Sequence, residues 1–116
     1  MARHFHVAFS VARPGQEAEL ERWYDEQHIP DCLRLDGFVA AQRFRIAEPP
    51  AGGVAVPAWK LMVIYEIESD DITATLAQIP KVVRTEAMPM TDAIDMGSAL
   101  RLTAQAAGPK VARATP

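Results

Sequence analysis

The sequence predicts one α+β domain with four strands and two helices. Four segments alternate apolar with polar side chains or concentrate β-branched and aromatic residues, as strands do. Two other segments repeat apolar residues at intervals of three and four, as helices do. The predicted order is strand, helix, strand, strand, helix, strand. A chain of 116 residues suits a single core, which we expect over residues 1–107, with a flexible tail over 108–116.

The first strand is predicted over residues 4–11, where Phe5, Val7 and Phe9 alternate with other side chains. Pro14-Gly15 interrupts the chain, and acidic residues follow where the positive end of a helix dipole favours them. The first helix should therefore begin there and continue until Pro30 disturbs its backbone. Its inward stripe is expected at Leu20, Trp23, Tyr24 and His28.

The second and third strands are predicted on either side of a loop. Residues 38–46 follow the Asp36-Gly37 turn and alternate with one polar face. Residues 48–57 contain three prolines and two glycines, which predicts an exposed connection. Residues 58–67 are predicted to form the most buried strand, with one face made by Trp59, Leu61, Val63 and Tyr65.

The second helix should begin at a cap provided by residues 69–71 and end at Pro80. Its inward stripe is expected at Ile72, Leu76 and Ile79. Residues 81–96 are predicted to be irregular or a broken helix, since Pro89 interrupts them. Residues 98–106 alternate again, which predicts the fourth strand.

This order is the split βαβ arrangement of a ferredoxin-like domain, βαββαβ, with a four-stranded antiparallel sheet. The helices are expected to cover one face of the sheet. The other face should mix polar and apolar side chains, which normally calls for a cover. We expect a second copy of the chain to supply it, making a homodimer. The residues expected on this face are Arg43, Arg45, Lys60, Met62, Ile64 and Arg101.

Charge and composition exclude several partner classes. The net charge is −3 and no basic run is present, so no nucleic-acid partner is expected. The longest apolar stretch, residues 61–65, is too short for a membrane helix, so no membrane partner is expected. Cys32 is the only cysteine and the first residues do not form a signal peptide. A cytoplasmic location follows as the expectation.

Two motifs resemble a known family. Residues 21–30 read ERWYDEQHIP, with an aromatic pair and a His-x-Pro, and residues 36–44 read DGFVAAQRF, with a Gly-aromatic turn. Together they resemble the EthD-like branch of the dimeric α/β-barrel superfamily. The resemblance is sharp over residues 20–46, and PMTDAID at 89–95 is a further echo. It departs at Asp36, where a proline often precedes the glycine.

The resemblance implies a homodimer that forms a dimeric α/β barrel, with a pocket between sheet and helices in each subunit. In many members this pocket works without metal or organic cofactor, so no cofactor is expected. Members include lactone isomerases, cofactor-free oxygenases of aromatic polyketides, cyclases, decarboxylases, dehydratases and haem-handling enzymes. Fold analogy therefore does not name the reaction.

His28 and Tyr24 are the catalytic candidates. They lie one helical turn apart, so imidazole and phenol should line the same face. An imidazole can take or give a proton near neutrality, and a phenol can hold a substrate oxygen. The alternatives are that His28 caps a carbonyl at the broken helix end, and that Tyr24 is an ordinary core aromatic.

Trp23, Arg43 and His6 are the candidates for substrate binding. Trp23 offers a large apolar surface and suits packing better than chemistry. Arg43 could neutralise an anionic substrate group, or form a salt bridge inside the dimer barrel. His6 is expected on the same sheet face as Arg43, opposite the His28 site, as a second acid or base or as a solvated or inter-subunit histidine.

Other chemistries lack their motifs. Three histidines without a His-Glu-x-x-His or paired-cysteine pattern predict no metal site. Gly52-Gly53 lies in a proline-rich loop with no helix opening after it, so it predicts no phosphate cradle. Cys32 has no general base at a predictable spacing, which leaves a catalytic thiolate or, more ordinarily, a small buried apolar group.

The sequence thus predicts a small cofactor-independent enzyme that acts by proton transfer, of the isomerase, lyase or oxygenase type. Its expected substrate is an apolar carbonyl, lactone or aromatic compound, with His28 as acid or base and Tyr24 orienting it. The rival prediction is a non-catalytic dimeric protein that holds a small apolar ligand or a partner enzyme in the same pocket. A pocket containing both residues and open to solvent favours the enzyme.

Overall fold

The computed structural model of the chain describes residues 1–47 and 59–115. The predicted loop over 48–57, and the first residue of the strand predicted from 58, lie outside the described residues. The four strands are β1 (Ala2–Ser10), β2 (Phe38–Arg45), β3 (Leu61–Ser69) and β4 (Leu100–Gln105). They form an antiparallel sheet in the order β2-β3-β1-β4. This topology confirms the predicted ferredoxin-like α+β fold.

The first helical stretch is longer than predicted. It consists of α1 (Glu17–Trp23), a π-helical turn η1 (Tyr24–His28) and α2 (Ile29–Cys32), so Pro30 does not end it. The Ile29 amide donates to the Tyr24 carbonyl, five residues back. In a regular α-helix the ring of Pro30 would clash with the carbonyl four residues earlier, and the wider π turn relieves that clash.

The second helical stretch is capped as predicted but also continues past its proline. Asp71 accepts a hydrogen bond from the Ala74 amide at 3.1 Å and caps α3 (Ile72–Leu76). The following helix, α4, spans Gln78–Val82 and includes Pro80. Pro80 is the third residue of α4, where an amide has no intrahelical acceptor in any case. The missing N–H therefore costs little and does not stop the helix.

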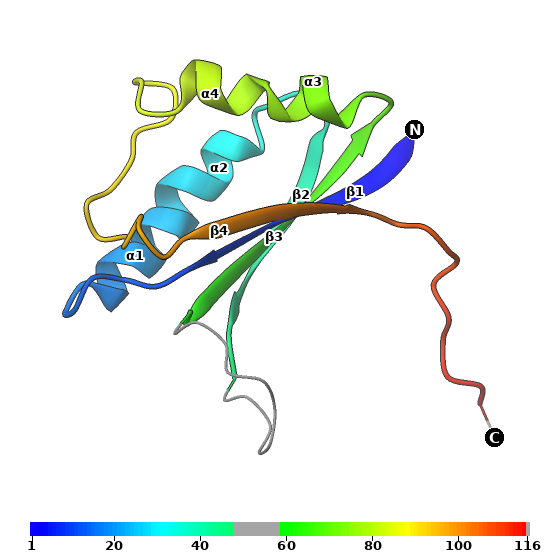
Figure 1. The fold of residues 1–116 in the computed structure, drawn as a ribbon, viewed down its shortest axis with the longest axis horizontal. Helices are drawn as coiled ribbons and strands as arrows, with labels where there is room; N and C mark the ends of the chain where they lie inside the picture. Colours follow the sequence, from blue (N-terminus) through cyan, green and yellow to red (C-terminus); the bar gives the residue numbers. More distant parts are fainter. Residues whose placement is uncertain (48–58, 116) are drawn as a thin grey trace.

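The helices lie on one face of the sheet (Figure 1). Strand β1 turns alternate residues toward them, and these are His4, His6, Ala8 and Ser10. Between the layers lies the hydrophobic core, to which helices, sheet and the segment before β4 all contribute. Its buried members are Leu20, Trp23, Tyr24, Cys32, Phe38, Leu61, Val63, Tyr65, Ile67, Met88, Ala93 and Ile94.

A bulge in β2 reverses the predicted facing of its side chains. Phe38 pairs with Ile67, but the next regular pair is Ala40 with Glu66. Because side chains alternate along a strand, the extra residue turns every later position to the other face. Arg43, opposite Val63, therefore lies on the helix-covered face with Phe38, and the prediction that it faces away from the helices is wrong.

The uncovered face of the sheet is more apolar than predicted. Arg101 pairs with the helix-facing Ala8, so it also leaves this face. Trp59 was expected beside Leu61, but it precedes β3 and stacks on Phe9 at 4.9 Å between ring centroids. By register, the uncovered face consists of Phe5, Val7, Phe9, Ala40, Gln42, Phe44, Met62, Ile64, Glu66, Leu100, Leu102 and Ala104.

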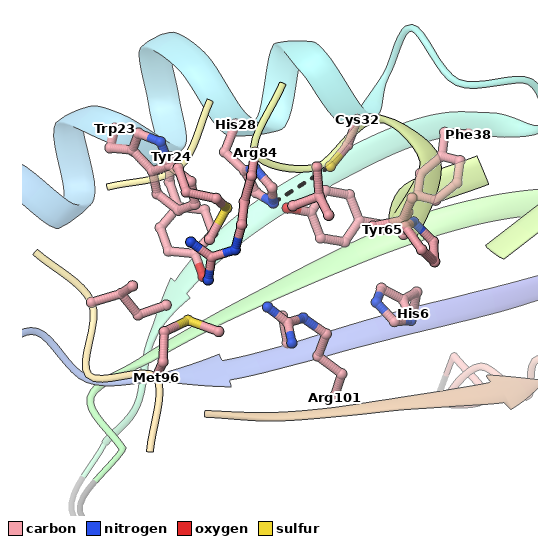
Figure 2. A pocket seen from close by; sticks show the side chains of 16 residues that line it. His6, Trp23, Tyr24, His28, Cys32, Phe38, Tyr65, Arg84, Met96 and Arg101 are labelled. Atoms are coloured by element: carbon pink, nitrogen blue, oxygen red, sulfur yellow. Dashed lines mark hydrogen bonds between the residues drawn. The ribbon is translucent and has the colours of Figure 1, made fainter. Parts of the chain in front are cut away.

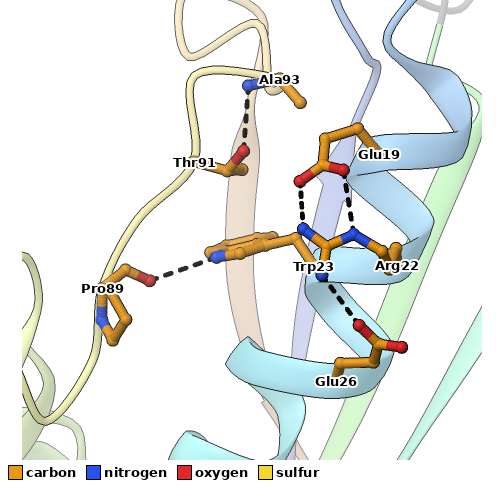
Figure 3. A network of polar contacts seen from close by, with 7 residues as sticks. All are labelled: Glu19, Arg22, Trp23, Glu26, Pro89, Thr91 and Ala93. Carbon is orange, nitrogen blue, oxygen red and sulfur yellow. Dashed lines mark hydrogen bonds and ion pairs between the residues drawn. The ribbon is translucent and has the colours of Figure 1, made fainter.

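Residues 83–99 are irregular, as predicted, and are anchored at several points. Met88 is fully buried and Val83 forms an isolated bridge with it. The Trp23 indole donates to the Pro89 carbonyl at 3.2 Å (Figure 3). Ile94 bridges to Ala12. These contacts hold the segment against the first helical stretch and close one side of the space between helices and sheet.

Residues 106–115, which follow β4, contain no helix or strand and are exposed throughout. Within the described ranges, no helix combines the length and apolar character needed to cross a bilayer.

Candidate functional site

A cavity of about 270 Å³ lies between the helices, the 83–99 segment and the helix-facing side of the sheet (Figure 2). It reaches the surface, because exposed residues such as Arg84 and Arg101 form part of its wall. Among the described residues, none that lines it is acidic. The lining residues are His6, Ala8, Trp23, Tyr24, His28, Cys32, Phe38, Tyr65, Ile79, Pro80, Val83, Arg84, Met90, Ile94, Met96 and Arg101.

His28 is held in this cavity by two aromatic rings. Its imidazole stacks on Trp23 at 4.4 Å and 17° and meets the edge of Tyr24 at 5.8 Å between centroids. Its Nε2 lies 3.6 Å from Cys32 Sγ, and its buried Nδ1 has no hydrogen-bond partner among the described residues. The alternative that His28 caps a backbone carbonyl is therefore wrong for the part of the chain described.

The imidazole of His28 and the neighbouring thiol of Cys32 are both uncharged at neutral pH. Burial and, next, the charge of Arg101 lower the pKa of His28 to about 4, although Asp31 opposes the shift. Burial raises the pKa of the Cys32 thiol to about 11. A neutral imidazole therefore faces a neutral thiol. The imidazole can accept a proton or a hydrogen bond, whereas the thiol is a poor nucleophile.

Two phenols line the same cavity. Tyr24 is buried, and its hydroxyl lies 3.4 Å from Ser10 Oγ. Burial raises the pKa of Tyr24, so it remains a neutral donor. Tyr65 is 2% exposed, and its hydroxyl lies near the Cys32 thiol but makes no well-formed hydrogen bond with a described residue. Burial also raises the pKa of Tyr65 well above its ordinary value. An unpartnered buried hydroxyl is costly unless a ligand or water satisfies it.

His6 lines the cavity with His28, so the expectation that it lies on the opposite side of the sheet is wrong. The reason is that β1 turns His6 toward the helices, in register with Tyr65 of β3 and Thr103 of β4. His6 Nδ1 lies 2.9 Å from Thr103 Oγ1. Burial and, next, Arg101 lower its pKa. His6 is therefore a second neutral imidazole at the same site.

Arg43 shares the helix-covered face with His6 but is absent from the cavity wall. Its guanidinium donates to both carboxylate oxygens of Asp25, at 2.9 and 3.0 Å, and lies 3.2 Å from Glu21. Arg43 thus forms a salt bridge within the chain, between β2 and the first helical stretch, and not at the uncovered face where a salt bridge inside the dimer barrel was predicted. Its geometry is that of a structural ion pair.

Sequence reasoning missed three polar residues of the wall. The alternation of Arg101 with Leu100 and Leu102 is correct, but the sequence prediction assigns Arg101 to the uncovered face, whereas it lies on the helix-covered face. Tyr65 is predicted only as a core residue. Its phenol in the most buried strand is the feature of the sequence that could have indicated a polar group at the site. Arg84 lies in the irregular segment, where no periodicity indicates which way a side chain points.

The part of the chain that the structure describes contains no group of three His, Cys, Asp or Glu side chains able to hold a metal ion. The cavity combines two neutral imidazoles, one thiol, two phenols and two guanidinium groups around an apolar space.

Comparison with known proteins adds little to this geometry. No family model and no curated protein matches the chain. Among solved structures, the chain is similar to an ethyl tert-butyl ether D (EthD) family protein from Bacillus halodurans, with 13% identity and a TM-score of 0.49. The similarity covers 92% of this chain and 100% of the other.

Proposed function

We propose that the chain is a small cofactor-independent enzyme that moves a proton on an apolar carbonyl, lactone or aromatic substrate. The observation that carries the proposal is His28, neutral and held by Trp23 and Tyr24 in a cavity that reaches the surface. Geometry of this kind suits a base that acts on a bound ligand.

In the proposed reaction, His28 accepts a proton from the carbon next to a substrate carbonyl. The electron pair of the C–H bond forms a carbon–carbon double bond while the carbonyl π pair moves to the oxygen, giving an enolate, and the imidazolium returns the proton to the same or another carbon. Tyr24 and Tyr65 are neutral phenols that can donate to the developing oxyanion. No electron is gained or lost overall, which is the balance of an isomerisation.

The low pKa of His28 limits which substrates it can deprotonate. A base with a pKa of about 4 is weak, so the carbon acid must be acidified by donors at its oxygen. Hydrogen bonds aimed at the enolate oxygen supply that effect in a site with little water. The proposal therefore includes His28 and the phenols as one unit.

The remaining expectations belong to the same proposal. The proposed membership in the EthD-like branch rests on the motifs at residues 20–46. The proposed homodimeric barrel rests on the same motifs. Turnover without added metal, haem or flavin, and a cytoplasmic location, are parts of it that experiment must test.

A non-catalytic binding protein is the second candidate, and the cavity wall is what favours it. Most of the lining side chains are apolar, and the pKa of His28 lies well below neutrality. Such a wall would hold a small apolar ligand without reacting with it.

Substitution of His28 separates the two functions. We expect His28→Gln to lower kcat at least about a hundredfold, because general-base catalysis contributes on that order. Ligand affinity should change little. Tyr24→Phe is measured beside His28→Gln, because it keeps the aromatic ring against His28 and removes only the hydroxyl that is hydrogen-bonded to Ser10. Substrates are found by screening carbonyl compounds and lactones for turnover by the wild-type protein.

The two candidates give different results. An enzyme loses turnover in His28→Gln and retains binding. A binding protein shows ligand affinity and no turnover in any variant. Full activity in His28→Gln would contradict the proposed role of the imidazole.

A further inference from the structure

Two arginines line the cavity from different elements of the fold. Arg101 comes from β4, on the helix-covered face, and Arg84 follows α4 at the start of the irregular segment. Figure 2 shows both side chains directed into the space below His28 and Tyr24. None of the described lining residues carries a carboxylate, and the full charges that they place on the wall at neutral pH are positive.

Neither arginine is neutralised by the part of the chain that is described. Residues 1–47 and 59–115 place no carboxylate oxygen within 4.0 Å of either guanidinium. Four other arginines, Arg22, Arg34, Arg43 and Arg45, have carboxylate partners, whereas Arg3, Arg13 and Arg113 likewise have none among the described residues. What distinguishes Arg84 and Arg101 from the other unpaired arginines is that both lie on the wall of a mostly apolar cavity, where their donors are free for a ligand.

The backbone at Arg84 is also unusual. Its φ of 68° lies in the left-handed region, and it is the only non-glycine residue with positive φ among those described. Such strain persists only where the surroundings impose it. Here the Arg84 amide donates to the carbonyl of the fully buried Met88 at 2.9 Å. The turn that carries Arg84 at the cavity is therefore held from the core.

We infer that the cavity binds an organic carboxylate with an apolar ring or chain, its carboxylate held between Arg84 and Arg101. Planar guanidinium forks match the geometry of a carboxylate and bind it with two hydrogen bonds each. The wall offers rings and methyl groups to the rest of the ligand, as Trp23, Phe38 and Met90 lie along it. The inference rests on the proposed function for the reaction, and it adds the class of substrate.

A bound carboxylate would also act on the base. The Arg101 charge is the second cause, after burial, that lowers the pKa of His28. An anion beside Arg101 offsets that charge, so the imidazole becomes a better proton acceptor when the proposed substrate is present. The carboxylate would thus orient the substrate and assist the proton transfer.

The test uses calorimetric titration of the full chain with two probes of one shape, 2-naphthoate and its neutral amide, 2-naphthamide. The carboxylate should bind at least about tenfold more tightly than the amide, as hydrogen bonds to charged groups of this kind imply. Arg84→Gln and Arg101→Gln should each weaken carboxylate binding about tenfold and leave amide binding unchanged. Arg45→Gln is the control, because it removes an exposed arginine paired with Glu21 outside the cavity.

Arg84→Lys adds a second check, because it keeps the charge and loses the planar fork; its affinity should fall between wild type and Arg84→Gln. Circular dichroism confirms that each variant is folded. Equal affinity for the two probes, or no carboxylate binding at millimolar concentration, would overturn the inference. Loss of affinity in Arg45→Gln equal to that in the cavity variants would do the same.

The carboxylate site and the proposed proton transfer can be tested separately. His28→Gln should still prefer the carboxylate probe, since the arginines remain. A retained preference together with full turnover in His28→Gln would remove the proposed base and keep the carboxylate site. Loss of turnover in His28→Gln without any probe preference would remove the carboxylate site and keep the base.

Discussion

At the scale of single residues, His28 combines an unusual position with an unusual pKa. It is the last residue of the π turn η1, and such turns in α-helices often occur at functional sites. Its ring stacks on Trp23 and meets the edge of Tyr24, so its orientation does not depend on a polar partner at Nδ1. The imidazole is therefore positioned by packing, before any ligand arrives.

The lowered pKa of His28 predicts a pH-dependent stability. Its pKa is about 4 in the folded chain against an ordinary value of 6.5. Between these values the unfolded chain binds a proton that the folded chain does not, so the free energy of unfolding falls as pH decreases. The loss should begin near pH 6.5 and approach roughly 3 kcal/mol at pH 4.

Urea unfolding of wild type and His28→Gln at several pH values measures this contribution. The slope between pH 6.5 and 4 should be smaller in the variant, because the titrating group is gone. His6, whose pKa is also lowered, leaves a remaining slope of the same sign. Parallel pH profiles for the two proteins would show that His28 is not buried as the structure has it.

At the scale of elements, the turn into β2 depends on a glycine. Gly37 has φ +89°, and a Cβ there would lie 3.1 Å from the Glu68 carbonyl and 3.2 Å from Thr75 Cγ2. The turn has little freedom to move away, because the Gly37 carbonyl accepts from the Glu68 amide at 2.9 Å. The glycine therefore sets the approach of the turn to β3 as well as its own conformation.

Gly37→Ala should consequently destabilise the fold more than a matched change at Gly15. Both glycines have positive φ, but a Cβ at Gly15 meets nothing within 4 Å. Gly15→Ala should cost roughly 1–2 kcal/mol from backbone strain alone. Gly37→Ala should cost about 1 kcal/mol or more beyond that, from the added contacts. Thermal unfolding of both variants compares them, and equal losses would mean that the β2 turn yields easily.

At the scale of the whole molecule, one face of the sheet has no cover within the described chain. Leu100 and Leu102 are 43% and 45% exposed, and they continue the apolar rows of β1 and β3. Because the bulge and the register remove Arg43 and Arg101 from this face, it is better suited to burial than the sequence suggested. A second copy of the chain remains the proposed cover.

Sedimentation velocity tests the proposed homodimer. Wild type should sediment as a dimer at micromolar concentration, and Leu102→Glu should sediment as a monomer, because it would bury a charge at the interface. Val111→Glu makes the same kind of change at a site that is 86% exposed, outside the sheet, and should remain dimeric. A monomeric wild type would contradict the proposal, and so would a dimeric Leu102→Glu.

The sequence by itself determined the order of elements, because alternation and helical periodicity are local properties of the chain. It also brought His28 and Tyr24 to one face, since residues four apart on a helix are neighbours. It did not determine where the helices end, because a proline can be accommodated by a π turn or by the first turn of a helix. For that reason the predictions that Pro30 and Pro80 end or disturb their helices are wrong.

The tertiary structure decided which face each strand residue takes and which groups share the cavity. Alternation separates two faces without saying which is covered, and the bulge after Phe38 exchanges them within β2. The register of β4 on β1 then brings Arg101 to the side of His6. Arg84 reaches the cavity through a turn anchored on buried Met88, a contact between an irregular segment and the core. Pairing and packing across the fold thus assemble a site whose individual residues are far apart in the sequence.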